Sequence, residues 1–215
     1  MKLHRGIVFG WSLSLLLLVG CSSAYYSAYE KFGVYKRDLL KKRVVEARDD
    51  QKEAGEQFKD ALTRIKELYG FDGGNLEKVY DSLKSDFDRS ATKAADVRKR
   101  VKEVEDVADD LFSEWEKELN EITSGSLRDK SRDQLRDTRR RYDELHTALK
   151  RAENSMEPVL SQFRDQVLFL KHNLNAQALS SLQKEALNIQ DDITKLLAEM
   201  DRSIQQADSF ISALP

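Results

Sequence analysis

Cys21 is the single cysteine among 215 residues. Its thiol is therefore the one strongly nucleophilic sulfur in this sequence. A lone thiol cannot form an intramolecular disulfide, so its chemistry is nucleophilic attack or covalent modification. The histidines beyond the first 20 residues are His146 and His172, and neither belongs to a His-Glu-x-x-His or Glu-x-x-His pattern. We interpret both as solvent-facing or helix-capping residues, and we expect no catalytic residue, no metal site and no cofactor.

The residues that precede Cys21 form a short export leader. Lys2 and Arg5 provide a basic head, and an apolar run follows over residues 7–19. At about 1.5 Å per helical residue this run covers roughly 20 Å, which is short of the roughly 30 Å hydrocarbon core of a bilayer. We therefore predict that residues 1–20 are a secretory signal peptide and not a membrane span.

The segment Leu18-Val19-Gly20-Cys21 resembles a bacterial lipobox. This resemblance implies cleavage between Gly20 and Cys21, a diacylglycerol on the thiol and acylation of the freed amine. Because each buried methylene contributes about 0.8 kcal/mol, two or three acyl chains would hold the protein on a membrane essentially for good. An unmodified cysteine in an ordinary signal peptide, or an uncleaved anchor, is the alternative. Ser22, in place of an Asp after the cysteine, implies by the same resemblance an outer-membrane lipoprotein on the periplasmic side of the cell envelope.

Residues 21–35 are interpreted as the lipidated N-terminus and a linker. The aromatic rings of this segment suit the headgroup region of a bilayer, and they belong to Tyr25, Tyr26, Tyr29 and Phe32. Basic residues follow between Lys31 and Arg43. Two interpretations of these residues stay open: they rest on anionic lipid headgroups, or they belong to a solvated linker and the first helical turns.

Charge and composition argue against nucleic-acid binding. Without residues 1–20, 34 of the 36 basic residues remain against 38 acidic ones, a formal net charge of −4. A mildly acidic protein outside the cytoplasm is a poor candidate for binding nucleic acid. The clusters Arg98-Lys99-Arg100 and Arg139-Arg140-Arg141 stand close to acidic residues, and we interpret them as solvated helix faces with local ion pairs.

Long helices are predicted because only two prolines and nine glycines interrupt a chain rich in good helix formers. Apolar residues recur in steps of three and four, which is the spacing of a coiled-coil seam. This spacing extends over four segments, which are residues 40–68, 76–122, 135–174 and 179–211.

Chain reversals are predicted at residues 70–75, 124–126 and 172–175. The sequence thus predicts an all-α fold, an elongated antiparallel helical bundle with coiled-coil-like seams over residues 36–215. Four helices are favoured. A three-helix bundle with a long last helix is the alternative, because residues 172–175 contain neither Gly nor Pro.

Local residue types predict how these helices begin and end. Asn75 is expected to cap the second helix, and Ser126 the third. Pro158 removes a backbone hydrogen bond, so a kink or a fresh start near Ser155 is expected. The asparagines of the last reversal are able to adopt the left-handed conformation, with Asn175 as the cap of the final helix.

The chain also resembles a family of proteobacterial lipoproteins known as domain of unknown function two-nine-five-nine. The resemblance rests on the lipobox, on Glu30-Lys-Phe-Gly-Val34, on Phe71-Asp72-Gly73-Gly74 and on the segment from Gln166 to Asn175. It covers nearly the whole mature chain. It implies an all-helical envelope protein, and it implies no activity.

The apolar face of the third predicted helix broadens near residue 167, which indicates contact from two sides. We therefore predict an interaction face there, formed by Phe163, Val167, Leu168, Phe169 and Leu170. Four aromatic residues stand at or beside seam positions: Trp115, Tyr142, Phe163 and Phe169. This spacing is typical of core residues. The alternative is that they line a cleft for a hydrophobic ligand between helices.

The favoured functional hypothesis is a non-enzymatic, lipid-anchored spacer or protein-docking module. The alternative is a carrier or sensor of a hydrophobic ligand held between helices, and a hydrolase would need a convergent polar cluster. The expected partners are the membrane, through a lipid on Cys21, and an unknown envelope protein, with no nucleic acid. The sequence leaves the oligomeric state open, homo-oligomers included.

Overall fold

The computed structural model describes residues 35–67 and 75–214. The predicted signal peptide, the lipobox with Gly20 and Cys21, and the linker up to residue 34 lie outside the described residues, as do residues 70–74 of the reversal predicted at 70–75. Every regular element in the described part of the chain is an α-helix. The all-α class is therefore confirmed.

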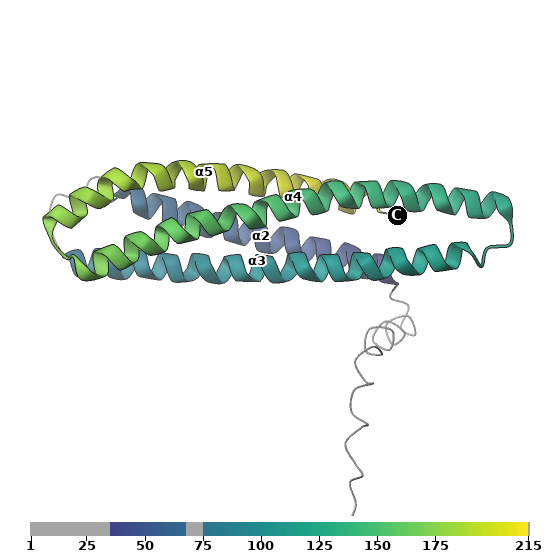
Figure 1. Cartoon of the computed structure of the whole chain (residues 1–215), viewed down its shortest axis with the longest axis horizontal. Coiled ribbons are helices and arrows are strands. Elements are labelled where there is room, and N and C mark those ends of the chain that lie inside the picture. The colour runs from purple at the N-terminus through teal and green to yellow at the C-terminus, as the bar shows by residue number, and fades with distance from the viewer. Residues whose placement is uncertain (1–34, 68–74, 215) are drawn as a thin grey trace, which may run out of the picture.

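Four long helices follow one another: α2 (Lys36–Glu67), α3 (Leu76–Leu119), α4 (Gly125–His172) and α5 (Ala176–Ala213). Figure 1 shows them lying along one common axis. The 48 residues of α4 extend about 70 Å at 1.5 Å per residue. Helix α4 ends at His172 and α5 begins at Ala176, so the helix is interrupted at residues 173–175. For the described residues, the prediction of four helices is therefore confirmed, and the alternative with one long last helix is wrong.

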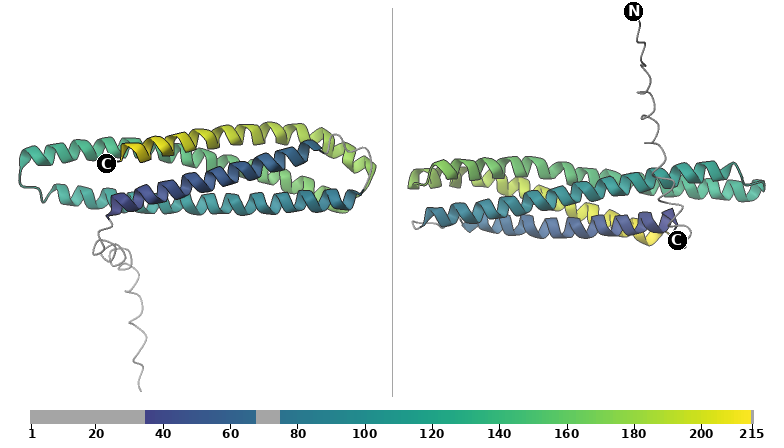
Figure 2. Two further views of the ribbon diagram at one scale, coloured as in Figure 1. Left: turned by 180° about the vertical axis from the view of Figure 1, so that it is seen from behind. Right: turned by 90° about the horizontal axis from the view of Figure 1, so that it is seen from below.

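Successive helices run in opposite directions, and α5 closes the bundle by packing on α2 (Figure 2). Ion pairs between α2 and α3 fix the direction: Lys36 pairs with Glu114, whereas Arg64, at the other end of α2, pairs with Asp86. Helix α4 packs on α3 and α5. Each helix therefore buries two adjoining stripes of its surface, one against each neighbour.

Most core residues stand at predicted seam positions, and the structure adds buried residues beside the seams: Leu39, Val107, Phe112, Leu119, Leu160, Phe210 and Leu214. Burying one such side chain contributes roughly 1.5–3 kcal/mol. Every one of the largest fully buried side chains stands at a position predicted from the three-and-four spacing: Phe58, Phe163, Leu40, Ile65, Leu83, Leu145, Leu149, Met156, Leu170, Ile189, Ile193 and Leu196.

The end of the predicted seam in α5 is wrong by one residue. Ser203 and Phe210 are buried there, whereas Ile204 and Ile211, which the polarity pattern had favoured, are half-buried. The buried residues keep a strict alternation of three and four, because the direction of a side chain follows from the helix geometry and not from its polarity. A serine hydroxyl is consequently placed in the middle of the bundle.

The helix starts agree with the sequence in one case and differ in another. Asn75 caps α3 as predicted, since its Oδ1 accepts hydrogen bonds from the backbone N of Glu77 at 3.0 Å and of Lys78 at 3.2 Å. The predicted Ser126 cap is wrong, because α4 already begins at Gly125 and Ser124 occupies the N-cap position without a side-chain capping bond.

Helix α4 passes Pro158 in one continuous ribbon, so the predicted fresh start near Ser155 is wrong (Figure 1). Pro158 lies on the exposed side of the helix, and Asn154, whose carbonyl loses its partner, is also exposed. Water can satisfy that carbonyl, which is why the helix tolerates the proline. At the C-cap, Asn173 has φ −134° and ψ 60°, so the left-handed conformation predicted for this turn is wrong for this residue.

One end of the bundle carries a two-helix arm. Helix α2 begins level with Glu114, and Phe210 near the end of α5 packs edge-on against Tyr142 of α4, with ring centroids 6.3 Å apart. Helices α3 and α4 continue beyond this level, so residues 115–141 project past α2 and α5 (Figure 2). Within the arm, Trp115 Nε1 donates a hydrogen bond to Ser131 Oγ at 2.8 Å.

Candidate functional site

The chain enters the bundle at Lys36, the first residue of α2. Cys21 lies about 15 residues before Lys36, and such a segment spans at most roughly 50 Å. The arm lies at the same end of the bundle as Lys36 (Figure 2). No helix within the described ranges is both long enough and apolar enough to cross a membrane.

The two histidines of the bundle do not form a metal site. His146 Nε2 lies 2.8 Å from Glu105 Oε1, and Lys150 Nζ approaches the same oxygen at 3.9 Å. His172 is exposed in the last turn of α4. Among the residues that the structure describes, no three His, Cys, Asp or Glu side chains are grouped closely enough to hold a metal ion.

Tyr142 belongs to the core and not to a ligand cleft. Its buried ring packs edge-on against Phe112 at 5.4 Å and stacks on His146 at 5.7 Å. Burial raises the pKa of the Tyr142 phenol above its ordinary value, and the negative charge of Asp109 and Glu105 adds to this. The side chain therefore stays a neutral phenol at physiological pH.

The basic cluster Arg98-Lys99-Arg100 forms ion pairs with neighbouring helices. Arg98 pairs with Glu157 of α4 at 2.5 Å, and Arg100 pairs with Asp50 of α2 at 2.9 Å. Hydrogen bonds to Glu103 and Asp50 raise the pKa of the Arg100 guanidinium. The prediction of solvated faces with ion pairs is confirmed for this cluster, and the structure adds that several pairs connect neighbouring helices.

The predicted interaction face divides into two parts. Phe163, Val167 and Leu170 are buried in the core, so they present no surface to a partner. Leu168 is 48% exposed and Phe169 is 40% exposed. Five nearly consecutive helical residues cannot share one face, because each residue turns the side chain by about 100°. The interaction face stays a prediction for Leu168 and Phe169.

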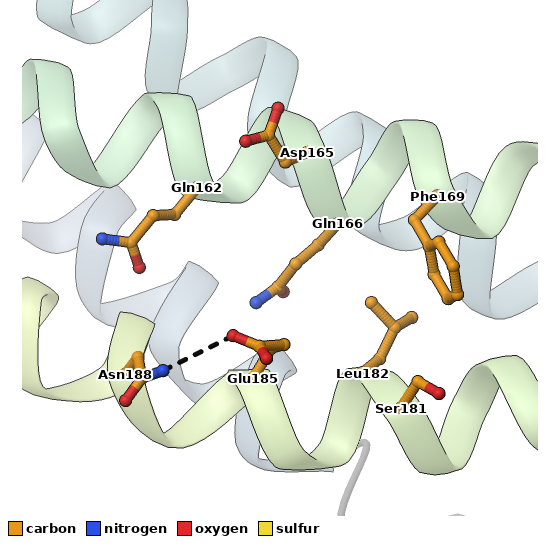
Figure 3. A pocket seen from close by; sticks show the side chains of 8 residues that line it. All are labelled: Gln162, Asp165, Gln166, Phe169, Ser181, Leu182, Glu185 and Asn188. Atoms are coloured by element: carbon orange, nitrogen blue, oxygen red, sulfur yellow. Dashed lines mark hydrogen bonds between the residues drawn. The ribbon is translucent and has the colours of Figure 1, made fainter.

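A cleft lies between α4 and α5 next to Phe169, with a volume of about 400 Å³. Figure 3 shows the side chains that line it, four from each helix. The cleft is lined from α4 by Gln162, Asp165, Gln166 and Phe169, and from α5 by Ser181, Leu182, Glu185 and Asn188.

Six of the eight residues that line the cleft are polar or charged, and Phe169 and Leu182 are apolar. Gln166 and Glu185 point toward each other across the cleft, and Phe169 and Leu182 form its apolar end (Figure 3). Gln166 is only 6% exposed, and its Oε1 has no hydrogen-bond partner in the described structure. A buried acceptor without a partner is costly, and this oxygen is shielded from solvent.

Sequence reasoning missed the polar lining. Gln166 stands three residues after Phe163 and four before Leu170, so a polar residue at seam spacing was the available indication on α4. Glu185 has the same spacing, three residues after Leu182 and four before Ile189, but it is exposed, and Ser181 and Asn188 carry no such pattern. Their place in the cleft follows from how α5 packs on α4, which the sequence does not specify.

Comparison with known families gives one match. The family model described as "Protein of unknown function (DUF2959)" matches residues 25–214, which is nearly the whole bundle and its preceding linker. The family resemblance inferred from the sequence is therefore confirmed. Comparison with curated proteins finds no match.

Proposed function

This chain belongs to the DUF2959 family of proteins of unknown function, and we propose that it is a lipid-anchored spacer and protein-docking module of the bacterial cell envelope. The observation that carries the proposal is where the chain enters the bundle. Lys36 lies at one end of a rod whose longest helix measures about 70 Å. A lipid on Cys21, about 15 residues earlier, would thus tether the rod by one end.

The tether gives the rod a direction. The end that carries the arm would lie toward the membrane, within reach of the linker. The α4–α5 turn would lie on the other side, because the 30 residues of α4 after Tyr142 extend about 45 Å away from the level of Lys36. The far end would be the part presented to an envelope protein.

A spacer must be rigid, and we infer that coiled-coil packing of the seams makes the bundle rigid. Buried residues alternate in steps of three and four along α2, for example Leu40, Val44, Ala47 and Gln51. This spacing places side chains where those of a facing helix form holes. We further propose the periplasmic face of the outer membrane as the location, from Ser22 after the lipid site.

Catalysis is not part of the proposal. The one cleft described above favours ligand binding as a second role. Its lining combines six polar or charged residues with Phe169 and Leu182, and a hydrophobic ligand held between helices stays the alternative considered from the sequence.

Substitution of the lipid site tests the anchor. Cys21→Ser should abolish palmitate labelling and leave the precursor uncleaved by the lipoprotein signal peptidase, while Ser22→Ala keeps the label. Label retained by Cys21→Ser would refute the lipid anchor.

Distances from the bilayer test the spacer. Leu127 on the arm and Leu187 on α5 form a matched pair, 59% and 61% exposed, and they lie roughly 55 Å apart along the rod. In vesicles that contain the full lipidated protein and a membrane dye, a fluorophore at residue 127 should transfer energy far more efficiently than one at residue 187. Equal transfer would mean that the rod lies flat on the membrane, and the spacer role would then fail.

A further inference from the structure

We propose that residues 25–32 pack as a short helix on the two-helix arm, on the side where α2 no longer lies alongside α3. The contact joins two parts of one chain, and it goes beyond the spacer role. It does not depend on the lipid anchor. Residues 25–32 themselves lie outside the described part of the chain.

Helix α3 turns one stripe of its surface toward α2 along the whole bundle. The residues of this stripe that contact α2 follow the three-and-four spacing of one helix face, and they are Asp86, Arg89, Lys93, Arg100, Glu103 and Glu114. Continued past Glu114, the same spacing reaches Lys117 and Glu121. Helix α2 begins level with Glu114, so in the arm this stripe has no neighbouring helix on its α2 side (Figure 2).

The arm offers open charged groups on this stripe. Lys117 and Glu121 are exposed, and neither side chain forms an ion pair with a residue that the structure describes. Trp115 and Ile122 are partly buried and pack against the edge of the core. An aromatic ring attracts an ammonium group within about 6 Å of its centre, and a carboxylate accepts a hydrogen bond from a phenol. The surface therefore suits a partner that brings both aromatic rings and phenols.

Residues 25–32 carry such side chains at the spacing of one helix face. Tyr25, Tyr29 and Phe32 follow one another in steps of four and three. A helix thus places one phenylalanine and two tyrosines on a single stripe. Their rings match Lys117, and the two phenols match Glu121.

The length of the chain allows this contact. Phe32 precedes Lys36 by four residues, so the two Cα atoms lie at most roughly 14 Å apart. A helix from Tyr25 to Phe32 covers about 10 Å, whereas residues 125–141 of α4 extend about 25 Å along the arm. So short a connection also holds the segment near the stripe at an effective concentration of about millimolar.

The family comparison supports the same assignment. The matching family model begins at residue 25, the first tyrosine of the proposed stripe, and it leaves out the leader and the lipobox. Residues 25–32 thus belong to the part of the chain that the family shares with the bundle.

Docking of this helix would bring the lipid site close to the arm. Cys21 precedes Tyr25 by four residues, so it would lie within roughly 14 Å of the docked helix, whereas an undocked segment allows roughly 50 Å from Lys36. This consequence rests on the proposed lipid anchor. The spacer would then stand on a short stalk beside the arm.

Spin labels at positions 27 and 123 test the contact by electron paramagnetic resonance, in the full lipidated protein in detergent micelles. Position 27 lies on the opposite side of the proposed helix from Tyr29, and Thr123 is exposed on the turn of the arm. We expect a narrow distance distribution centred below roughly 25 Å. A broad distribution, or one centred above that value, would overturn the proposal.

Matched variants identify the two surfaces. Tyr29→Ser should widen the distance distribution at least twofold, whereas Tyr26→Ser, which removes a tyrosine beside the stripe, should leave it narrow. Lys117→Ala should likewise widen it, whereas Lys130→Ala removes an exposed basic residue elsewhere on the arm and should not. Equal effects within either pair would mean that the proposed faces do not meet. Thermal melts check that the bundle of each variant stays folded.

The same label pair in Cys21→Ser separates this contact from the anchor. The distance should stay short there, because the contact involves no lipid. A short distance that is lost in Cys21→Ser would mean that the micelle surface holds the segment, and packing on the arm would be refuted. Palmitate labelling with a broad distribution would keep the anchor and reject the contact; a short distance without palmitate labelling would do the reverse.

Discussion

Lys36, the first residue of α2, forms an ion pair with Glu114 near the end of α3, with Nζ 2.8 Å from Oε1. This pair sets the register of α2 against α3 at the open end of their hairpin. It also marks the base of the arm, because α3 and α4 continue beyond the point along the bundle at which α2 begins. The start of α2, the end of α5 and the base of the arm therefore lie at the same position along the long axis of the bundle.

The first prediction concerns this shared level. Arg48 of α2 contacts Asp208 of α5 at 2.8 Å, and Asp38 lies ten residues, about 15 Å, nearer the start of α2. Spin labels at the exposed positions 38 and 208 should therefore lie roughly 15–25 Å apart by electron paramagnetic resonance.

A second label pair provides the control. Positions 38 and 187 should give a distance about 30 Å longer, because 21 residues of α5 separate 187 from 208. A distance above roughly 40 Å between 38 and 208 would contradict the antiparallel closure of α5 on α2.

The second prediction concerns a buried amide in the middle of the bundle. Gln51 is fully buried, and neither Nε2 nor Oε1 has a hydrogen-bond partner in the described structure. The ion pair of Arg48 with Asp208, and the position of Met200 beside Gly55, place Ser203 at the same level of α5, where it is also buried and unpartnered. Gln51→Leu should raise the free energy of unfolding by about 1–2 kcal/mol, because it removes two unpaired polar atoms.

Urea denaturation at equal protein concentration measures this gain. Ser203→Ala serves as the comparison and should change stability less, since it removes one hydroxyl in place of a whole amide. A loss of stability in Gln51→Leu would show that the amide is satisfied, for instance by a buried water molecule.

The third prediction concerns alkaline pH. The pKa of Tyr142 is raised by burial, so the folded state favours the neutral phenol more than the unfolded state does. Its contribution to stability is complete below the unfolded pKa of about 10 and is lost as pH rises from there toward the folded pKa, by about 1.4 kcal/mol per pH unit.

Tyr142→Phe isolates this contribution, because it keeps the ring and removes the titrating group. The variant should lose less stability than the unchanged protein above about pH 10, with the two curves parallel near neutrality. Urea melts across this range, with tyrosinate absorbance as a second readout, provide the measurement. Parallel curves throughout would mean that Tyr142 titrates normally.

The sequence by itself determined the fold class and most of the core. Helix formation follows from local composition, and the burial of Phe58, Leu83 and Leu145 follows from a spacing that any helix imposes on its own side chains. The Asn75 cap is likewise a contact over three residues. The family resemblance rests on the sequence for the same reason, because the residues that carry it can be compared without knowing their neighbours in space.

Only the tertiary structure decided which polar residues are buried together. Asp86 is 2% exposed and pairs with Arg64 of α2 and Arg89 of its own helix, whereas Phe87, which stood at the predicted seam position beside it, is half-buried. Gln166 and Glu185 line one cleft for the same reason (Figure 3). These contacts depend on the register and rotation of helices that lie far apart in the chain. A periodic pattern determines which stripe of a helix is buried. It does not determine which residues of another helix pack against that stripe.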